Sequence, residues 1–189
     1  MIETLDAVRE GALGRLREGA GSRHSAMHTA VVATADADVR VMVLRGFETS
    51  EWTLRFHTDA RATKTATIES DPRVGVLAYD DKAKVQLRLR GTGRIERRGP
   101  IADAAWDDSS ELARRCYLGA APGETRTLPS SGLPDWAEGI QPTEDQLAPA
   151  RNNFAVLLVA VEEIDWYWLS NDGHRRALLC RDGGHWLTP

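Results

Sequence analysis

The sequence predicts a mainly β fold: an antiparallel β-barrel with flanking helices. About seven or eight segments carry β-branched and apolar residues in strand-like patterns, and short turns join most of them. Only two or three segments have helical spacing, and these do not alternate with the strands, which argues against a doubly wound parallel sheet. Because 189 residues lie within the usual size of one domain, we expect a single domain over residues 1–189.

The composition excludes several classes of protein. Apolar residues make up 42% and charged residues 28% of the chain, as in ordinary globular proteins. A net charge of −4 argues against a nucleic-acid partner. No apolar run approaches the roughly 20 residues of a membrane span, and residues 1–19 are charged throughout, unlike a secretory signal. We therefore expect a cytoplasmic protein without a membrane partner.

The first half of the chain begins with apolar residues at helical spacing over residues 4–18. Residues 28–47 then form two strand-like runs around Asp36-Ala37-Asp38, which predicts a hairpin. A third strand follows at 52–57. The period then changes to that of a helix over 60–70, which Pro72 closes by pushing Asp71 out of the helical region.

The second half is expected to contain strands at 73–79 and 83–96, joined by Asp80-Asp81. Residues 100–118 have the pattern of a helix that starts at Pro100. A long segment rich in Gly, Pro, Ser and Thr follows, and loops of this length are either functional or mobile. Three further strands are predicted, at 154–161, 164–169 and 177–180.

Familiar catalytic and nucleotide-binding motifs are missing. The chain has no GxGxxG after a strand, no P-loop, no GxSxG and no HExxH. Its five histidines lack ligand spacing, and Cys116 and Cys180 are far apart with no CxxC. We expect no metal site, and no residue can be assigned as catalytic.

Two arginines occupy unusual positions in the second strand of the hairpin. Arg40 shares a strand face with Met42 and Leu44, whereas Arg45 lies on the opposite face with Val41 and Val43. A charge on an apolar face is costly unless it is paired. Either these arginines lie at strand ends and reach water, or they meet an anionic ligand.

The segment from His57 to Lys64 runs from the end of a strand into the start of a helix. A helix N-terminus favours a phosphate because its N–H groups are unpaired and its dipole is positive there. The hydroxyls of Thr58 and Thr63 and the cations of Arg61 and Lys64 suit a phosphate dianion. The alternative, about equally supported, is a solvated first turn with Asp59 as its N-cap.

Four motifs together resemble the pyridoxamine 5′-phosphate oxidase-like flavoproteins, in particular their pyridoxamine oxidase-related FMN-binding branch. They are RVMVLRGF at 40–47, LRFHTDARATK at 54–64, DPRVGVLAY at 71–79 and KVQLRLRGTGRIE at 84–96. The resemblance continues through Asp165-Trp166, His174-Arg175-Arg176 and the terminal Trp186, and is weakest over 119–150. It implies an antiparallel FMN-binding split barrel, usually a homodimer with two flavins at the interface.

The resemblance also implies roles for particular residues. Arg40 and Lys64 would bind the FMN phosphate, with Arg61 and Thr63 beside them, although the family has an arginine at the position of Thr63. The flavin ring would lie along Val41, Met42 and Val43, near Arg45, His57 and Thr58, with Gln86 at its edge. Trp166 and Arg176 would reach across the dimer interface, and a shift of one residue would replace Trp166 by Tyr167. Arg45 and His174 would face the substrate.

Two departures concern the substrate. The family's tyrosine, arginine and serine for the pyridoxal phosphate group are not clearly matched in 108–116, and Asp172 stands where an arginine accompanies His174. We therefore expect an FMN-dependent oxidoreductase acting on an unknown small molecule. The alternatives are a flavin- or haem-binding carrier or sensor without turnover, and a deazaflavin-dependent reductase. The flavin interpretation requires Arg40 and Lys64 to lie close enough to share one anion.

Overall fold

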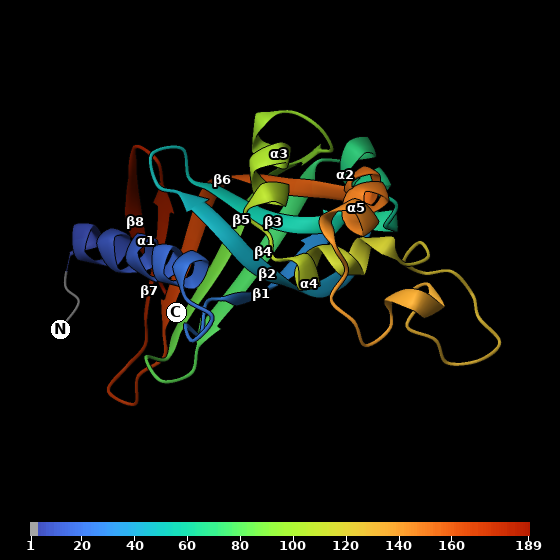
Figure 1. Ribbon diagram of the computed structural model, residues 1–189. Helices are drawn as coiled ribbons and strands as arrows, with labels where there is room; N and C mark the ends of the chain where they lie inside the picture. Colours follow the sequence, from blue (N-terminus) through green and yellow to red (C-terminus); the bar gives the residue numbers. More distant parts are fainter. Residues whose placement is uncertain (1–3) are drawn as a thin grey trace.

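The computed structural model describes residues 4–189 and contains eight antiparallel strands with helices around them (Figure 1). The strands are β1 (Thr29–Thr34), β2 (Val39–Glu48), β3 (Thr53–Asp59), β4 (Arg73–Asp80), β5 (Val85–Glu96), β6 (Phe154–Trp168), β7 (Arg175–Cys180) and β8 (Gly183–Leu187). Their order is β3-β2-β1-β4-β5-β6-β7-β8, and an additional pairing of β3 with β6 closes the first six strands into a barrel. The predicted mainly β barrel with flanking helices is thereby confirmed.

Strand β6 is longer than the sequence pattern predicts. It is one strand of 15 residues, not two strands at 154–161 and 164–169. The pairing with β5 skips Glu162 of β6, between the Arg90–Glu163 and Gly91–Val161 pairs, so the strand continues through a β-bulge. The first part of β6 pairs with β3 and so closes the barrel. Its last part pairs with β7, and β8 pairs with β7, so these two strands extend the sheet beyond the barrel.

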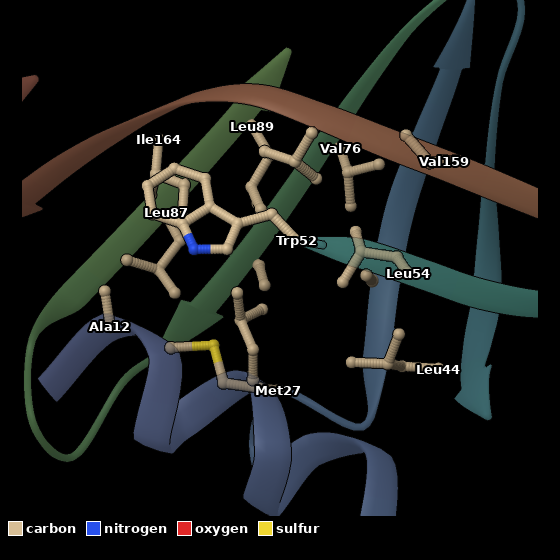
Figure 2. Close-up of a cluster of buried hydrophobic side chains, with 14 of the residues drawn as sticks. Ala12, Met27, Leu44, Trp52, Leu54, Val76, Leu87, Leu89, Val159 and Ile164 are labelled. Atoms are coloured by element: carbon tan, nitrogen blue, oxygen red, sulfur yellow. The ribbon is translucent and has the colours of Figure 1, made fainter. Parts of the chain in front are cut away.

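The barrel interior is filled by apolar side chains from all six strands, and Figure 2 shows part of this core. Trp52 lies between Ile164 and Leu87 on the strands and Met27 below them. Helix α1 (Leu5–Gly21) covers this end of the barrel through Val8, Ala12 and Leu16. Thr4 caps α1, its hydroxyl accepting from the Ala7 amide at 3.2 Å.

The region predicted as one helix over 100–118 is interrupted. It contains α3 (Pro100–Asp107), α4 (Glu111–Arg114) and the short 3-10 helix η1 (Arg115–Leu118). The break has a local cause, because the Ser110 hydroxyl accepts from the Ala113 amide and so starts a new helix.

A second apolar cluster holds these helices against the outer face of β6. Ala102, Ala105 and Trp106 of α3 pack on Phe154, Val156 and Leu158. Leu147 of α5 (Glu144–Leu147) and Ala150 of η3 (Ala148–Asn153) complete it. The remaining helices are α2 (Thr63–Ser70), which follows β3, and η2 (Asp135–Ala137) within the long 119–149 segment.

The close approach of the β6 backbone to Gly91 of β5 can be tested by substitution. A Cβ at this position would lie 2.0 Å from the backbone oxygen of Ala160. We therefore expect Gly91→Ala to lower the free energy of unfolding by at least about 2 kcal/mol, measured by urea denaturation. Gly11→Ala is the matched control, since nothing lies within 4 Å of a Cβ there. It should stabilise α1 by about 0.5–1 kcal/mol, and equal effects of the two variants would contradict the packing described.

Candidate functional site

A cavity of about 480 Å³ lies between the β2–β3–α2 side of the barrel and the α3–η1 segment. Its size is typical of sites for small organic ligands. Eight of the residues predicted from the sequence line it: Arg40, Val41, Met42, Val43, Arg45, His57, Thr58 and Lys64. The structure thus brings the β2 motif and the end of β3 to one place.

The cavity has a cationic group at each end of β2. Arg40 and Lys64 lie at one end, close enough for the charge of Arg40 to act on Lys64. Arg45 lies five residues further along the strand, which corresponds to about 16 Å in an extended chain. A ligand that engages both ends must therefore be elongated.

Lys64 is held in conditions that disfavour its charge. Burial lowers the pKa of the Lys64 ammonium, and the neighbouring Arg40 guanidinium lowers it further. Arg40 itself is fixed in orientation by Asp38, by the Thr34 hydroxyl and by the Val32 carbonyl oxygen at 3.2 Å. An anion between Arg40 and Lys64 would relieve the repulsion between the two cations.

His57 lies in the wall of the cavity with one ring nitrogen unsatisfied. Its ring packs edge-on against Phe154 with centroids 5.1 Å apart, and its Nε2 is buried with no hydrogen-bond partner among the described residues. Burial lowers the pKa of His57 to about 4, assisted by the charges of Arg45 and Arg55. The imidazole is therefore neutral at pH 7.

Arg61 and Thr63 are placed differently from the other predicted phosphate residues, since neither lines the cavity. The Arg61 guanidinium binds the Asp59 carboxylate at 2.7 Å and the Gly119 carbonyl oxygen at 3.0 Å. Asp59 does not cap α2, because the N-cap is Ala62 and the Asp59 carboxylate accepts instead from the Arg61 amide. Arg61 thus neutralises an acidic group that faces the cavity and anchors the start of the 119–149 segment.

The remaining predicted cofactor residues lie on β5, β6 and β7. Gln86 pairs with Tyr167, and Tyr167 pairs with Arg176, so the three form a row on the outer face of the sheet. The assignment of Trp166 to this row requires a correction. Trp166 is 2% exposed and packs in the barrel core, whereas Tyr167 takes the outward position.

Two ion pairs and one stacking contact fix the outer row. Asp165 is buried and accepts from Arg176 at 2.8 and 3.0 Å, and also from Arg88. His174 lies 5.6 Å from the Tyr167 ring, and its Nδ1 accepts from the Ser170 amide. The guanidinium of Arg176 is therefore held in a defined position beside Tyr167.

The row and the cavity are separate in one chain. Val41 pairs with Val31, Val31 with Leu77 and Leu77 with Arg88, so β5 lies three strands from β2, or about 14 Å along the curved barrel surface. The outer face between them is apolar and exposed: Val41 is 68% exposed, and Val39, Leu77 and Tyr79 are also open to solvent. Monomers rarely leave such a face uncovered.

The wall of the cavity opposite β2 comes from the segment around 108–116, where the sequence showed no clear match to the family's residues for the pyridoxal phosphate group. Ser109, Ala113, Cys116 and Tyr117 form it, with Pro122 at its end. The spacing 109, 113, 117 is helical, but a single continuous helix was predicted over this region, and its orientation relative to the barrel could not be derived. The signal that was available is Ser110, whose hydroxyl marks a new helix start.

Comparisons with known proteins agree with this architecture. Residues 12–97 match the family model described as pyridoxamine 5′-phosphate oxidase, FMN-binding domain. A pyridoxine/pyridoxamine 5′-phosphate oxidase from Rubrobacter xylanophilus is 30% identical over 163 residues, covering 82% of this chain and 73% of the relative.

Two solved structures show the same fold. A pyridoxamine 5′-phosphate oxidase-related, FMN-binding protein from Nostoc punctiforme superposes with a TM-score of 0.72 and 23% identity over 100% of both chains. PhzG from Burkholderia lata, solved with tetrahydrophenazine-1-carboxylic acid, has a TM-score of 0.63 and 16% identity over 96% of this chain and 88% of its own. They confirm the split barrel expected from the sequence.

Among residues 4–189, no helix is both long and apolar enough to cross a membrane. No group of three or more His, Cys, Asp or Glu side chains there is arranged to hold a metal ion.

The barrel topology, the family match and the Rubrobacter relative together establish that the chain belongs to the pyridoxamine 5′-phosphate oxidase family of FMN-binding proteins.

Proposed function

We propose that this protein is an FMN-dependent oxidoreductase whose cofactor phosphate binds between Arg40 and Lys64. The observation that carries this proposal is that two cations, one of them desolvated, face the same end of an elongated cavity. Asp38 pairs with Arg40 and, together with Asp59, partly offsets the repulsion at Lys64, but the net effect still disfavours the Lys64 charge. A phosphate dianion would suit this pair, because charge-assisted hydrogen bonds are strong where water is excluded. When bound, FMN would supply hydride or electron transfer, which is the chemistry of the cofactor.

The residues at the other end of the cavity would orient the ring and tune its surroundings. Arg45 would provide a positive field near the ring. The neutral His57 side chain lines the same part of the cavity, and a small rotation of its ring would let Nε2, which has no hydrogen-bond partner, bind the cofactor. Thr58 contributes a buried hydroxyl between the two ends. Arg61 acts indirectly in this proposal, because by binding Asp59 it keeps an uncompensated carboxylate away from the phosphate.

The proposal includes a homodimer in which each protomer completes the site of its partner. The outer row of Gln86, Tyr167 and Arg176 begins three strands from the β2 wall of the cavity in its own chain, and the exposed apolar face of β2, β1 and β4 lies between the two. Packing two such faces together would cover the apolar surface. It would also bring the row of one protomer toward the cavity of the other.

Replacement of Lys64 tests the phosphate site. We expect Lys64→Ala to raise the Kd for FMN about 10- to 100-fold, because a charged hydrogen-bond partner is worth about 1.5–3 kcal/mol. Lys82→Ala, in the exposed turn before β5, removes the same charge outside the cavity and should leave the Kd unchanged. Flavin fluorescence titration measures both, and equal Kd values for the two variants would rule out the assigned position of the phosphate.

His57 predicts a dependence of stability on pH. Its pKa is about 4 in the folded protein and near 6.5 when exposed, so the unfolded chain binds a proton that the native state refuses between these values. Stability therefore falls as pH decreases from 6.5 toward 4. His57→Gln should reduce the loss of unfolding free energy between pH 7 and pH 5, measured by urea denaturation. His185→Gln, at an exposed position of β8, should keep the wild-type loss.

The dimer can be tested at Leu77, which is 37% exposed on β4 and does not line the cavity. Leu77→Arg places a charge in the apolar face beside Arg88. We expect sedimentation velocity to show a monomer and FMN affinity to fall at least tenfold. Leu128→Arg introduces the same charge at another exposed apolar position, and should change neither. A dimeric Leu77→Arg variant with unchanged FMN affinity would argue for a different interface.

A further inference from the structure

Strand β2 contains a β-bulge at Arg45. Leu44 lies opposite Phe56 of β3, and the next pair along the two strands is Gly46 with Arg55. Arg45 is therefore the extra residue on β2 and has no partner on β3. Bulges of this kind redirect a side chain and are common next to functional sites.

The bulge separates two positive charges. If the register of Leu44 and Phe56 continued unbroken, Arg45 would lie directly opposite Arg55. Like charges in directly opposite positions destabilise a sheet. With the extra residue in β2, a glycine lies opposite Arg55 in place of a second arginine.

The two arginines line different spaces. Arg45 lines the candidate flavin cavity, and Arg55 does not. Arg55 lines a separate groove of about 500 Å³ on the outside of the barrel, together with Gly46, Arg94 and Leu158. Arg55 can therefore influence a ligand in the cavity only through the β2 backbone or through its charge at a distance.

Arg55 contacts the bulge at two points. Its guanidinium donates to the Arg45 carbonyl oxygen at 3.2 Å. It also lies directly over Gly46, because a Cβ at that position would be 3.0 Å from the Arg55 Nε. This Nε is buried with no hydrogen-bond partner among the described residues, so the Arg45 carbonyl oxygen is the acceptor that fixes the guanidinium there.

We propose that Arg55 is a positioning residue for the flavin site, which holds the β2 bulge and thereby directs the Arg45 side chain into the cavity. This role rests on the proposed FMN function, in which Arg45 provides a positive field near the ring. Gly46 belongs to the same arrangement, since a residue without a Cβ leaves room for the Arg55 guanidinium. Arg55 itself contacts neither the cavity nor the cofactor.

The first experiment compares the affinities of the site for reduced and oxidised FMN, whose ratio is obtained from the reduction potential of the bound flavin. A positive field near the ring favours the reduced form, so we expect Arg45→Met to lower this ratio about tenfold. Arg55→Met should lower it by a similar factor, although Arg55 lies outside the cavity. Arg94→Met removes a cation from the same outer groove and should leave the ratio unchanged.

Three further variants separate positioning from the charge of Arg55 itself. Adding Arg55→Met to Arg45→Met should change the ratio by less than about twofold, whereas two independent charges would have additive effects. Gly46→Ala keeps both charges but pushes the Arg55 guanidinium away, so it should lower the ratio as Arg55→Met does. Arg55→Lys keeps a donor for the Arg45 carbonyl oxygen and should restore part of the loss.

Urea denaturation shows which variants are folded, and Gly46→Ala decides the question if Arg55→Met is not. Additive effects in the double variant, or an unchanged ratio in Gly46→Ala, would overturn the positioning role of Arg55 while leaving the flavin site intact. Wild-type protein that fails to take up FMN would overturn both.

Discussion

The pairing of β3 with β6 determines both the closure of the barrel and the position of the candidate site. It closes the barrel, and it places His57 and Thr58 of β3 between the β2 arginines and the helices that pack on β6. Phe154 shows the coupling directly, since it lies opposite Asp59 in the register and contacts both His57 and Tyr117 through its ring. The β3–β6 pair thus positions both walls of the cavity. The same backbone hydrogen bonds close the barrel and hold the site in place.

Sequence patterns predicted the barrel well because alternation and turn residues are local signals. The hairpin around Ala37 and the strict alternation of β5 follow from residues within a few positions of each other. The placement of Trp166 on the outer face was wrong for the opposite reason. A strand exposes alternate side chains, so a one-residue shift in the assignment exchanges core and surface positions. Which face of β6 is buried depends on its partners β5 and β7, which are distant in sequence. The wall formed by Ala113 and Tyr117 likewise depends on tertiary packing.

Counting cations in a motif does not identify a binding site, because it cannot tell which cations are already paired. Arg61 and Lys64 are three residues apart and looked equivalent in the sequence. In the fold Arg61 binds Asp59 through both carboxylate oxygens, whereas Lys64 faces the cavity beside Arg40. Asp59, two positions before Arg61, pairs with it as Asp38 pairs with Arg40, so Arg40 differs from Arg61 in lining the cavity and not in being unpaired. The useful signal for a phosphate site is therefore a desolvated cation held beside another cation, which only the three-dimensional structure provides.

The separation of the two half-sites links cofactor binding to assembly in the proposed dimer. If FMN contacts Arg40 and Lys64 of one protomer and Arg176 of the other, it binds the dimer more tightly than the monomer. By linkage, the same free energy must stabilise the dimer when FMN is present. Asp165 would contribute to this coupling without touching the cofactor, because it holds Arg176 in place from a buried position. In the proposed dimer, the exposed apolar face would drive association of the two protomers. The row that contains Arg176 would make this association depend on bound FMN.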